Sequence, residues 1–194
     1  MQYNFSQNSQ EIIIQFEIQN PQQLIIELTE TSIFLTISST NPIISGTLYS
    51  SIIVEKSTKN FDQKTKIFQF KLFKSNLSNW PFVIIKEHPK GYLDPHSEFL
   101  LSKYYESQRV FDKSLKYLLS SYNKGHRQST IKLAMLYSFE YTGFPIEKDI
   151  NKAFIFWKKA AFLGSSNAQF IVFKRITQFL NEGIIFETKF KHEK

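Results

Sequence analysis

The sequence predicts an α+β protein in two domains, an N-terminal antiparallel β-sandwich of about seven strands and a C-terminal all-α helical-hairpin repeat of about five helices. Three observations predict this fold class. Before residue 90, apolar residues alternate in short runs that turn residues interrupt. After residue 95, apolar residues recur every three or four positions, as on one face of a helix. Residues 129–169 then repeat the pattern of the residues before them, as in scaffolds that hold other proteins.

The alternating runs place every second side chain on one face of a strand, so one face of each sheet is expected to be buried. Turns are expected at Asn20-Pro21, at Asn41-Pro42 and over the polar stretch 57–66. Short strands at this spacing are typical of a sandwich. The alternating apolar positions are Ile12, Ile14, Phe16, Ile18, Leu24, Ile26, Leu28, Ile33, Leu35, Ile37, Phe68, Phe70 and Leu72.

The boundary between the two halves is expected at residues 87–95, where Pro and Gly lie close together and the strand pattern stops. Asp94 is suited to cap a helix that begins at Pro95, because its side chain accepts a hydrogen bond from a free backbone N–H. His96 and Ser97 lie in the same helical turn as Asp94. A Ser–His–Asp relay needs groups from separate elements, so capping explains this trio better than catalysis does.

The helical half contains two copies of a hairpin, and the second copy has a longer loop over 140–149. Small residues at matching positions let the two helices of a hairpin approach closely, and Gly125 is suited to end a helix in the left-handed conformation. A last helix is expected to cover the end of the stack and to stop at 181–183. The apolar segment 184–186 beyond it would fold back onto the β domain or serve as a docking strand. The matching positions are Leu101, Ser102 and Tyr105 with Leu133, Ala134 and Tyr137, and Tyr117, Ser121 and Gly125 with Phe156, Ala160 and Gly164.

The first half resembles the CS domain. Residues 3–7, Tyr-Asn-Phe-Ser-Gln, are similar to its Tyr-x-Trp-x-Gln opening, 46–52 to its central strand and 70–74 to a late strand that ends in Lys. Residues 80–87, Trp-Pro-Phe-Val-Ile-Ile-Lys-Glu, resemble a Trp-Pro-x-Leu-x-Lys-Glu signature of p-twenty-three-type co-chaperones of the ninety-kilodalton heat-shock chaperone. The resemblance covers residues 1–88 and implies a sandwich that binds chaperones or clients without a cofactor. Those co-chaperones carry an acidic tail, whereas this C-terminus is basic.

The resemblance makes Lys74, Trp80, Lys86 and Glu87 candidates for protein contacts. Lys and Glu side chains are rarely buried unpaired, which favours a surface role for the charged three. For Trp80 the alternative is a position in the sandwich core, because an aromatic residue before Pro at a strand end commonly fills such a core.

The second half resembles the Sel-one-like repeat, a relative of the tetratricopeptide repeat. The residues that carry this resemblance are Leu133-Ala134, Tyr137, Gly143, Asp149, Lys152-Ala153, Lys159-Ala160-Ala161 and Gly164, and the copy at 97–125 is degenerate. The resemblance implies a concave surface lined by the first helix of each repeat. Lys103, Met135 and Lys174 occupy equivalent places there, so they are candidates for partner contacts or are ordinary exposed helix residues.

Composition narrows the function classes. The chain has no Cys, which excludes disulfides, thiolate nucleophiles and Cys-bound metals. The four His lack ligand spacing, and the six Gly form no phosphate-binding loop, so we expect no enzyme, no metal and no cofactor. The N-terminus lacks a signal-peptide pattern, and no segment approaches the ~20 apolar residues of a membrane span. A cytoplasmic protein is expected, with the cilium or nucleus as alternatives, and no membrane partner.

The net charge of +7 lies mostly in the helical half, where residues 91–194 carry 16 Lys or Arg and 10 Asp or Glu. This surplus is either a solvated surface or a field that attracts an acidic protein or nucleic acid.

The predicted function is a non-catalytic protein-interaction adaptor of co-chaperone type. The sandwich (1–88) would bind a client or a chaperone, for example the ninety-kilodalton heat-shock chaperone. The repeats (95–183) would bind a second protein. A linker (89–94) precedes them and a tail (184–194) follows them. CS domains joined to tetratricopeptide repeats also occur in factors that assemble axonemal dyneins, so assembly of such a complex is a candidate process. The alternatives are a structural subunit of a large stable complex and a nucleic-acid-binding protein.

Overall fold

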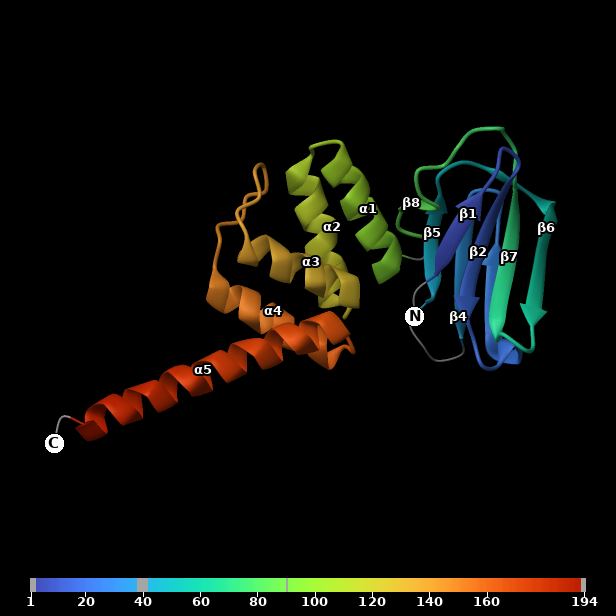
Figure 1. Cartoon of the computed structure of the whole chain (residues 1–194). Coiled ribbons are helices and arrows are strands. Elements are labelled where there is room, and N and C mark those ends of the chain that lie inside the picture. Colours follow the sequence, from blue (N-terminus) through green and yellow to red (C-terminus); the bar gives the residue numbers. More distant parts are fainter. Residues whose placement is uncertain (1–2, 38–41, 90, 193–194) are drawn as a thin grey trace. The chain divides into compact units, whose positions relative to one another are not determined.

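A computed structural model of the chain describes residues 3–37, 42–89 and 91–192, and side-chain surroundings as far as Asn181 (Figure 1). Contacts divide the chain into two compact units, Met1–Ser121 and Tyr122–Lys194. The first unit contains two antiparallel sheets and helices α1 and α2, and the second contains α3, α4 and α5. The predicted α+β class, a β-sandwich followed by helices, is therefore confirmed. None of the described helices is long and apolar enough to cross a membrane.

The sheets contain eight strands within the described residues. One sheet has the order β1-β2-β7-β6 and the other the order β3-β4-β5-β8. The expected turn at Asn20-Pro21 is confirmed as a short 3-10 helix, Pro21–Gln23, whereas Asn41 of the other expected turn lies outside the described residues. The strands are β1 (Asn4–Gln7), β2 (Glu11–Glu17), β3 (Leu24–Leu28), β4 (Ser32–Ile37), β5 (Ile44–Leu48), β6 (Ile52–Asp62), β7 (Ile67–Lys74) and β8 (Ile84–Lys86).

The prediction of a turn over the whole polar stretch 57–66 is wrong. Strand β6 continues through this stretch to Asp62, and the turn occupies only 63–66, where Lys66 has a positive φ of 58°. Among the described strands β6 is an edge strand that pairs with β7 alone, and after a register shift this pairing runs from Thr58 opposite Lys71 to Asp62 opposite Ile67. An edge strand that is held by backbone hydrogen bonds does not need the alternating apolar residues on which the prediction depended.

The sandwich core lies between the two sheets and continues into helix α1. The alternating residues of β2 and β7 are buried as predicted, as are Ile33 and Leu35 of β4, whereas Ile37 of β4 and the alternating residues of the edge strand β3 are half-buried. The same cluster includes Tyr3, Trp80 and Phe82, and it extends to Leu93 and Leu101. Trp80 therefore lies in the sandwich core, which was one of the two positions expected for it.

Asp94 caps α1 (Pro95–Ser107), as predicted. Its carboxylate accepts hydrogen bonds from Ser97 N at 2.8 Å and Ser97 Oγ at 2.6 Å. It also accepts a bond from Ser45 N of β5 at 3.1 Å, and the Tyr3 hydroxyl lies 2.9 Å from Ser97 Oγ. The helix cap therefore joins α1 to the sandwich. The contact division groups α1 and α2 with the sheets, and the domain boundaries 1–88, 89–94, 95–183 and 184–194 stay a prediction.

Each helical hairpin buries its small residues. Ser102, Ser114 and Ser121 are buried in the first hairpin, and Ala134, Ala153 and Ala160 are buried at the matching positions of the second. Gly125 and Gly164 follow the second helix of each hairpin with φ of 80° and 83°. A helical region is thereby established, and its assignment to the Sel-one-like repeat stays a prediction. The remaining helices are α2 (Phe111–Asn123), α3 (Arg127–Ser138), α4 (Ile150–Phe162) and α5 (Ser166–His192).

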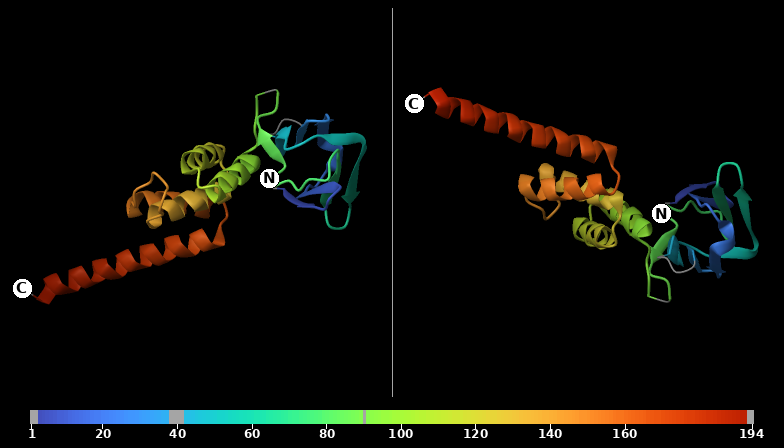
Figure 2. Two further views of the ribbon diagram at one scale, coloured as in Figure 1. Left: turned by 90° about the horizontal axis from the view of Figure 1, so that it is seen from above. Right: turned by 90° about the horizontal axis from the view of Figure 1, so that it is seen from below.

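The helix end predicted at 181–183 is wrong. Helix α5 runs through these residues to His192, and both views of Figure 2 show its second half extending past α3 and α4. A single Gly costs a helix about 1 kcal/mol relative to Ala, but unlike Pro it removes no backbone hydrogen bond, so it weakens a helix without stopping it.

Gly46 lies where strands β5 and β8 make close contact. A Cβ atom at this position would overlap Cγ2 of Ile84 and lie 2.6 Å from the backbone oxygen of Lys86. We expect Gly46→Ala to lower the free energy of unfolding by about 2 kcal/mol, because overpacking forces β8 away from β5. Urea unfolding of the variant beside the wild type measures the difference. A loss below about 0.5 kcal/mol would show that β8 moves freely, contrary to this packing.

Candidate functional site: a charged hollow beside strand β8

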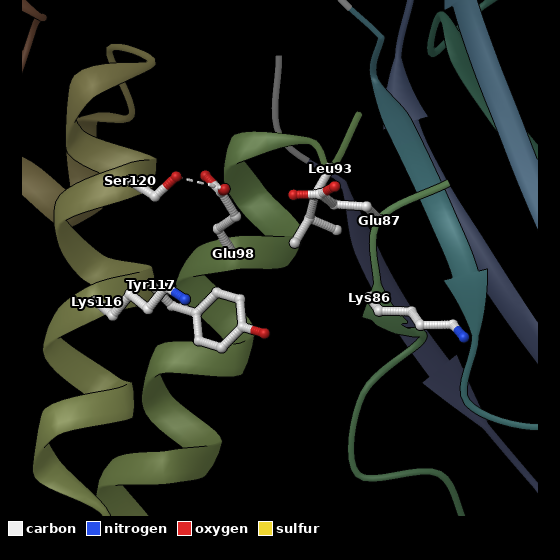
Figure 3. Close-up of a pocket in the computed structure, with 7 residues that line it drawn as sticks. All are labelled: Lys86, Glu87, Leu93, Glu98, Lys116, Tyr117 and Ser120. Carbon is white, nitrogen blue, oxygen red and sulfur yellow. Dashed lines mark hydrogen bonds between the residues drawn. The ribbon is translucent and has the colours of Figure 1, made fainter. Parts of the chain in front are cut away.

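A hollow of about 330 Å³ lies within the first unit, between strand β8 and the hairpin of α1 and α2 (Figure 3). Its lining includes two Lys, two Glu and one Tyr together with the apolar Leu93. Its lining residues are Lys86, Glu87, Leu93, Glu98, Lys116, Tyr117 and Ser120.

Strand β8 positions the first wall. Lys86 pairs with Thr47 of β5, and the register of the two strands shifts between Thr47 and Leu48. Thr47 Oγ1 donates a hydrogen bond of 3.0 Å to the backbone oxygen of Glu87, which fixes the chain where the strand ends. Both Lys86 and Glu87 are exposed, so a partner can reach their charged groups.

Helices α1 and α2 supply the second wall. Glu98 is buried in the first turn of α1, and its Oε1 accepts a 2.6 Å hydrogen bond from Ser120 Oγ of α2. The ring of Tyr117 stacks on Tyr105 with centroids 5.6 Å apart and planes 2° from parallel. These contacts between the two helices hold the aromatic side of the hollow in place.

Burial and neighbouring carboxylates act together on Tyr117. Burial raises the pKa of Tyr117, and Tyr105 and the carboxylates of Glu87 and Glu98 raise it further. Lys86 and Lys116 line the same hollow, and the Lys86 side chain points away from the two helices (Figure 3). Carboxylates and cations side by side around an aromatic surface suit the charged and polar side chains of another protein. Among the residues with described surroundings, no group of three His, Asp or Glu lies together as a metal site would require.

Two predicted site residues, Lys86 and Glu87, meet in this hollow, whereas Lys74 and Trp80 lie elsewhere. Lys74 is buried, and its Nζ donates hydrogen bonds to Gln7 Oε1 at 2.8 Å, to the Asn8 carbonyl at 2.8 Å and to the Ser78 carbonyl at 2.7 Å. Burial lowers the pKa of the Lys74 ammonium. Gln7 also accepts from Trp80 N at 2.9 Å and donates to Trp80 O at 2.7 Å. Gln7 thus links Lys74 and Trp80 in one hydrogen-bond network.

The three helical candidates belong to different units. Lys103 is exposed on α1 in the first unit, while Met135 is half-buried on α3 and Lys174 is exposed on α5 in the second. A common binding surface for these three residues stays a prediction.

Sequence reasoning missed Glu98, Lys116 and Tyr117 as site residues. Their helical periodicity places Tyr117 next to the buried Leu118, but it does not indicate that β8 lies opposite α2. The only sequence signal was their position in the first hairpin, directly after the Lys86-Glu87 signature.

Other hollows lie elsewhere among the described residues. A slot of about 340 Å³ lies between edge strand β3 and strands β6 and β7, with Leu24, Ile26 and Phe61 among its lining residues. A smaller hollow of about 150 Å³ lies in the second unit, where Trp157 of α4 meets Arg175 of α5. Both have fewer charged groups than the hollow beside β8.

Comparison with known proteins gives one family. Residues 1–70 match the family model of the CS domain. No curated protein matches the sequence. A solved structure of the nuclear movement protein from E. cuniculi GB-M1 is 18% identical over 43% of this chain and 98% of that chain, with a TM-score of 0.39. The CS domain of human KIAA1068 protein is 20% identical over 45% of this chain and 75% of that chain, with a TM-score of 0.39. The CS-b5R domains of human Ncb5or are 16% identical over 43% of this chain and 25% of that chain, with a TM-score of 0.37.

Proposed function

We propose that this chain, whose N-terminal sandwich contains a CS domain, is a non-catalytic adaptor of co-chaperone type. A CS domain is a protein-interaction module found in co-chaperones. In this proposal the sandwich and first hairpin bind a chaperone or client, and the later helices bind a second protein. The observation that carries it is the hollow in which Glu87 of the CS-type signature faces Glu98 and Tyr117 of the hairpin (Figure 3).

The hollow suits a partner segment that carries both charges. A Lys or Arg of the partner would approach the carboxylate of Glu87 and the ring of Tyr117. An acidic residue of the partner would approach Lys86 or Lys116 at the rim. Aromatic and charged groups that lose water together are typical of the few residues that dominate the energy of an interface.

The test uses the full chain and purified ninety-kilodalton heat-shock chaperone, without nucleotide and with a non-hydrolysable ATP analogue. We expect binding in at least one nucleotide state, and we expect the double variant Glu87→Ala/Lys116→Ala to bind about tenfold more weakly. The matched control is Lys59→Ala, which removes an exposed cation beside the slot at β6 and should leave binding unchanged.

Two results would contradict this proposal in different ways. Absence of binding in both nucleotide states rejects this chaperone as the partner. Equal binding by the double variant and the wild type rejects the hollow as the contact surface. The finer steps, bridging to a second protein and assembly of a complex such as axonemal dynein in the cytoplasm or cilium, are part of the proposal and would be tested by proximity labelling.

The second candidate function is a structural subunit of a stable complex. The large exposed apolar side chains of α5, which include Phe170, Phe173 and Leu180, favour it because they would be covered permanently in an assembly. Size-exclusion chromatography of the isolated chain separates the two functions. An adaptor is expected to be monodisperse, whereas an orphan subunit is expected to aggregate.

A further inference from the structure

A row of three aromatic rings lies along one side of helix α4, and a Lys ammonium lies over the ring at each end. The ring of Phe156 stacks on that of Tyr137 of α3, with centroids 5.3 Å apart and planes 10° from parallel. Its other neighbour is Tyr122, whose centroid is 5.1 Å away and whose plane is inclined by 70°. Lys152 Nζ lies 5.6 Å from the ring centroid of Tyr137, and Lys159 Nζ lies 3.9 Å from that of Tyr122. These five residues, the aromatic row, all belong to the second unit.

The sequence of α4 places both charges on the same side of the helix. Lys152, Phe156 and Lys159 are four and three residues apart, which is the spacing of neighbours on one helix face. With a rise of 1.5 Å per residue, the two Lys leave the helix about 10 Å apart along its axis. Both Lys side chains are exposed, and the three rings are half-buried. Because an aromatic ring attracts the ammonium above it, each charge is held at its end of the row.

The charge around the aromatic row is mostly positive. Residues 122–181 contain nine Lys or Arg and three Asp or Glu, and all three acids lie in the segment between α3 and α4. One of them, Asp149, lies 3.9 Å from Lys152, so the Lys152 end of the row is partly neutralised. Lys159 lies at the other end, in the last turn of α4, a helix that contains no Asp or Glu. The row therefore suits a partner that carries negative charge.

The packing of the rings indicates which kind of anion fits. Single-stranded nucleic acid binds to aromatic faces on which its bases can stack. In the aromatic row, Phe156 and Tyr137 cover one another, and the ammonium groups lie over Tyr137 and Tyr122. A bilayer would need large exposed apolar side chains, whereas these rings are half-buried. A protein segment fits both features, because its carboxylates can reach the two ammonium groups while an apolar side chain contacts the rings between them.

We propose that the aromatic row binds an acidic segment of a partner protein, in which two side-chain carboxylates flank an apolar residue. One carboxylate pairs with Lys152 and the other with Lys159, and the apolar residue lies against Phe156. The inference rests on the proposed adaptor function and assigns the chemistry of the second partner. The row lies in the second unit, whereas the hollow beside β8 lies in the first, so the two surfaces can be tested separately.

The test is a selection from displayed random peptides with the full-length protein as the target. We expect the enriched sequences to carry two or more Asp or Glu around an apolar residue. For a selected peptide, we expect Lys152→Gln/Lys159→Gln to weaken binding about tenfold and Lys159→Gln alone about threefold. Lys152→Arg/Lys159→Arg should retain most of the binding, because Arg keeps the charge and also lies well over an aromatic ring.

The matched control is Lys158→Gln, which should leave binding unchanged. Lys158 is the neighbour of Lys159 on α4, is also exposed and also lies over a ring, with Nζ 5.4 Å from the centroid of Phe154. Phe154 lines the hollow between α4 and α5 and is not part of the aromatic row. The control therefore removes the same charge from the same helix at a different place.

Several outcomes would overturn the inference. Selected peptides without Asp or Glu, or no enrichment, would remove the acidic partner. Equal losses in Lys158→Gln and Lys159→Gln would mean that the general charge of the unit attracts the peptide and that the row is not a site. Binding of an oligothymidylate that Lys152→Gln/Lys159→Gln abolishes would make the row a nucleic-acid site. Chaperone binding is measured in parallel and should be the same for this double variant as for the wild type, so failure of this inference is distinguishable from failure of the proposed function.

Discussion

Replacing Trp80 with Ala is expected to lower the free energy of unfolding by about 4 kcal/mol. Trp80 is 1% exposed and belongs to the sandwich core, where its ring centroid lies 6.0 Å from that of Tyr49. Removal of the indole leaves a cavity that the two sheets cannot close, because Gln7 holds the backbone of Trp80 from both its N and its O. Urea unfolding followed by circular dichroism measures the loss.

Trp80→Phe separates this structural role from a direct role in binding. The indole Nε1 is buried and has no hydrogen-bond partner among the described residues. A buried donor without an acceptor costs about 1–3 kcal/mol, so Phe removes that cost while it retains most of the packing. We expect Trp80→Phe to lose under about 1.5 kcal/mol. If Trp80→Ala instead retained the wild-type stability and lost only chaperone binding, Trp80 would be a contact residue and this account would be wrong.

The strands that face the core could be predicted from the sequence because burial imposes a simple pattern. Ile12, Ile14 and Phe16 alternate with exposed or half-buried neighbours, and the structure buries all three. The polar part of edge strand β6, from residue 57 to Asp62, could not be predicted, because a strand held by one neighbour needs no alternating apolar residues. The start of helix α1 could also be predicted, because Asp94 is a suitable N-cap and a Pro follows it at the first helical position.

Only part of the candidate site could be predicted from the sequence, for a different reason. Lys86 and Glu87 belong to a contiguous signature, whereas Glu98 and Tyr117 reach the same hollow from two helices. Periodicity reports which side of a helix is buried, but it does not report which strand lies opposite. Lys74 and Trp80 also belong to motifs, but their side chains are buried and joined through Gln7. A motif residue can therefore stabilise the fold and need not contact a partner.

Two buried titratable groups at the joint between sandwich and α1 have opposite effects on stability. Burial raises the pKa of Asp94 from 3.8 to about 6, although hydrogen bonds from Ser97 and Ser45 oppose the shift and Glu98 adds slightly to it. Burial lowers the pKa of His96 from 6.5 to about 4, although a hydrogen bond with the Tyr3 backbone opposes the shift, and Lys103 adds slightly to it. The His96 ring lies edge-on to Tyr3 with centroids 4.7 Å apart.

The sign of each contribution follows from which state binds the proton more tightly. Folded Asp94 holds its proton more tightly than unfolded Asp94, so the native state gains up to about 3 kcal/mol as pH falls from about 6 to 4. Unfolded His96 takes up its proton first, so the native state loses about 3 kcal/mol as pH falls from about 6.5 to 4. The two contributions nearly cancel at this joint, which makes its stability almost independent of pH in this window.

Replacing either Asp94 or His96 is therefore expected to reveal the pH dependence that the other residue contributes. His96→Phe keeps an aromatic ring against Tyr3 and should become about 3 kcal/mol more stable as pH falls from 6.5 to 4, relative to the wild type over the same range. Asp94→Asn keeps a helix-capping side chain and should become less stable over that range by a similar amount. The double variant should restore the weak pH dependence of the wild type, whatever its absolute stability. Chemical unfolding at several pH values measures all four proteins. Parallel curves for all four would mean that Asp94 and His96 titrate alike in the folded and unfolded chain, which their burial at this joint opposes.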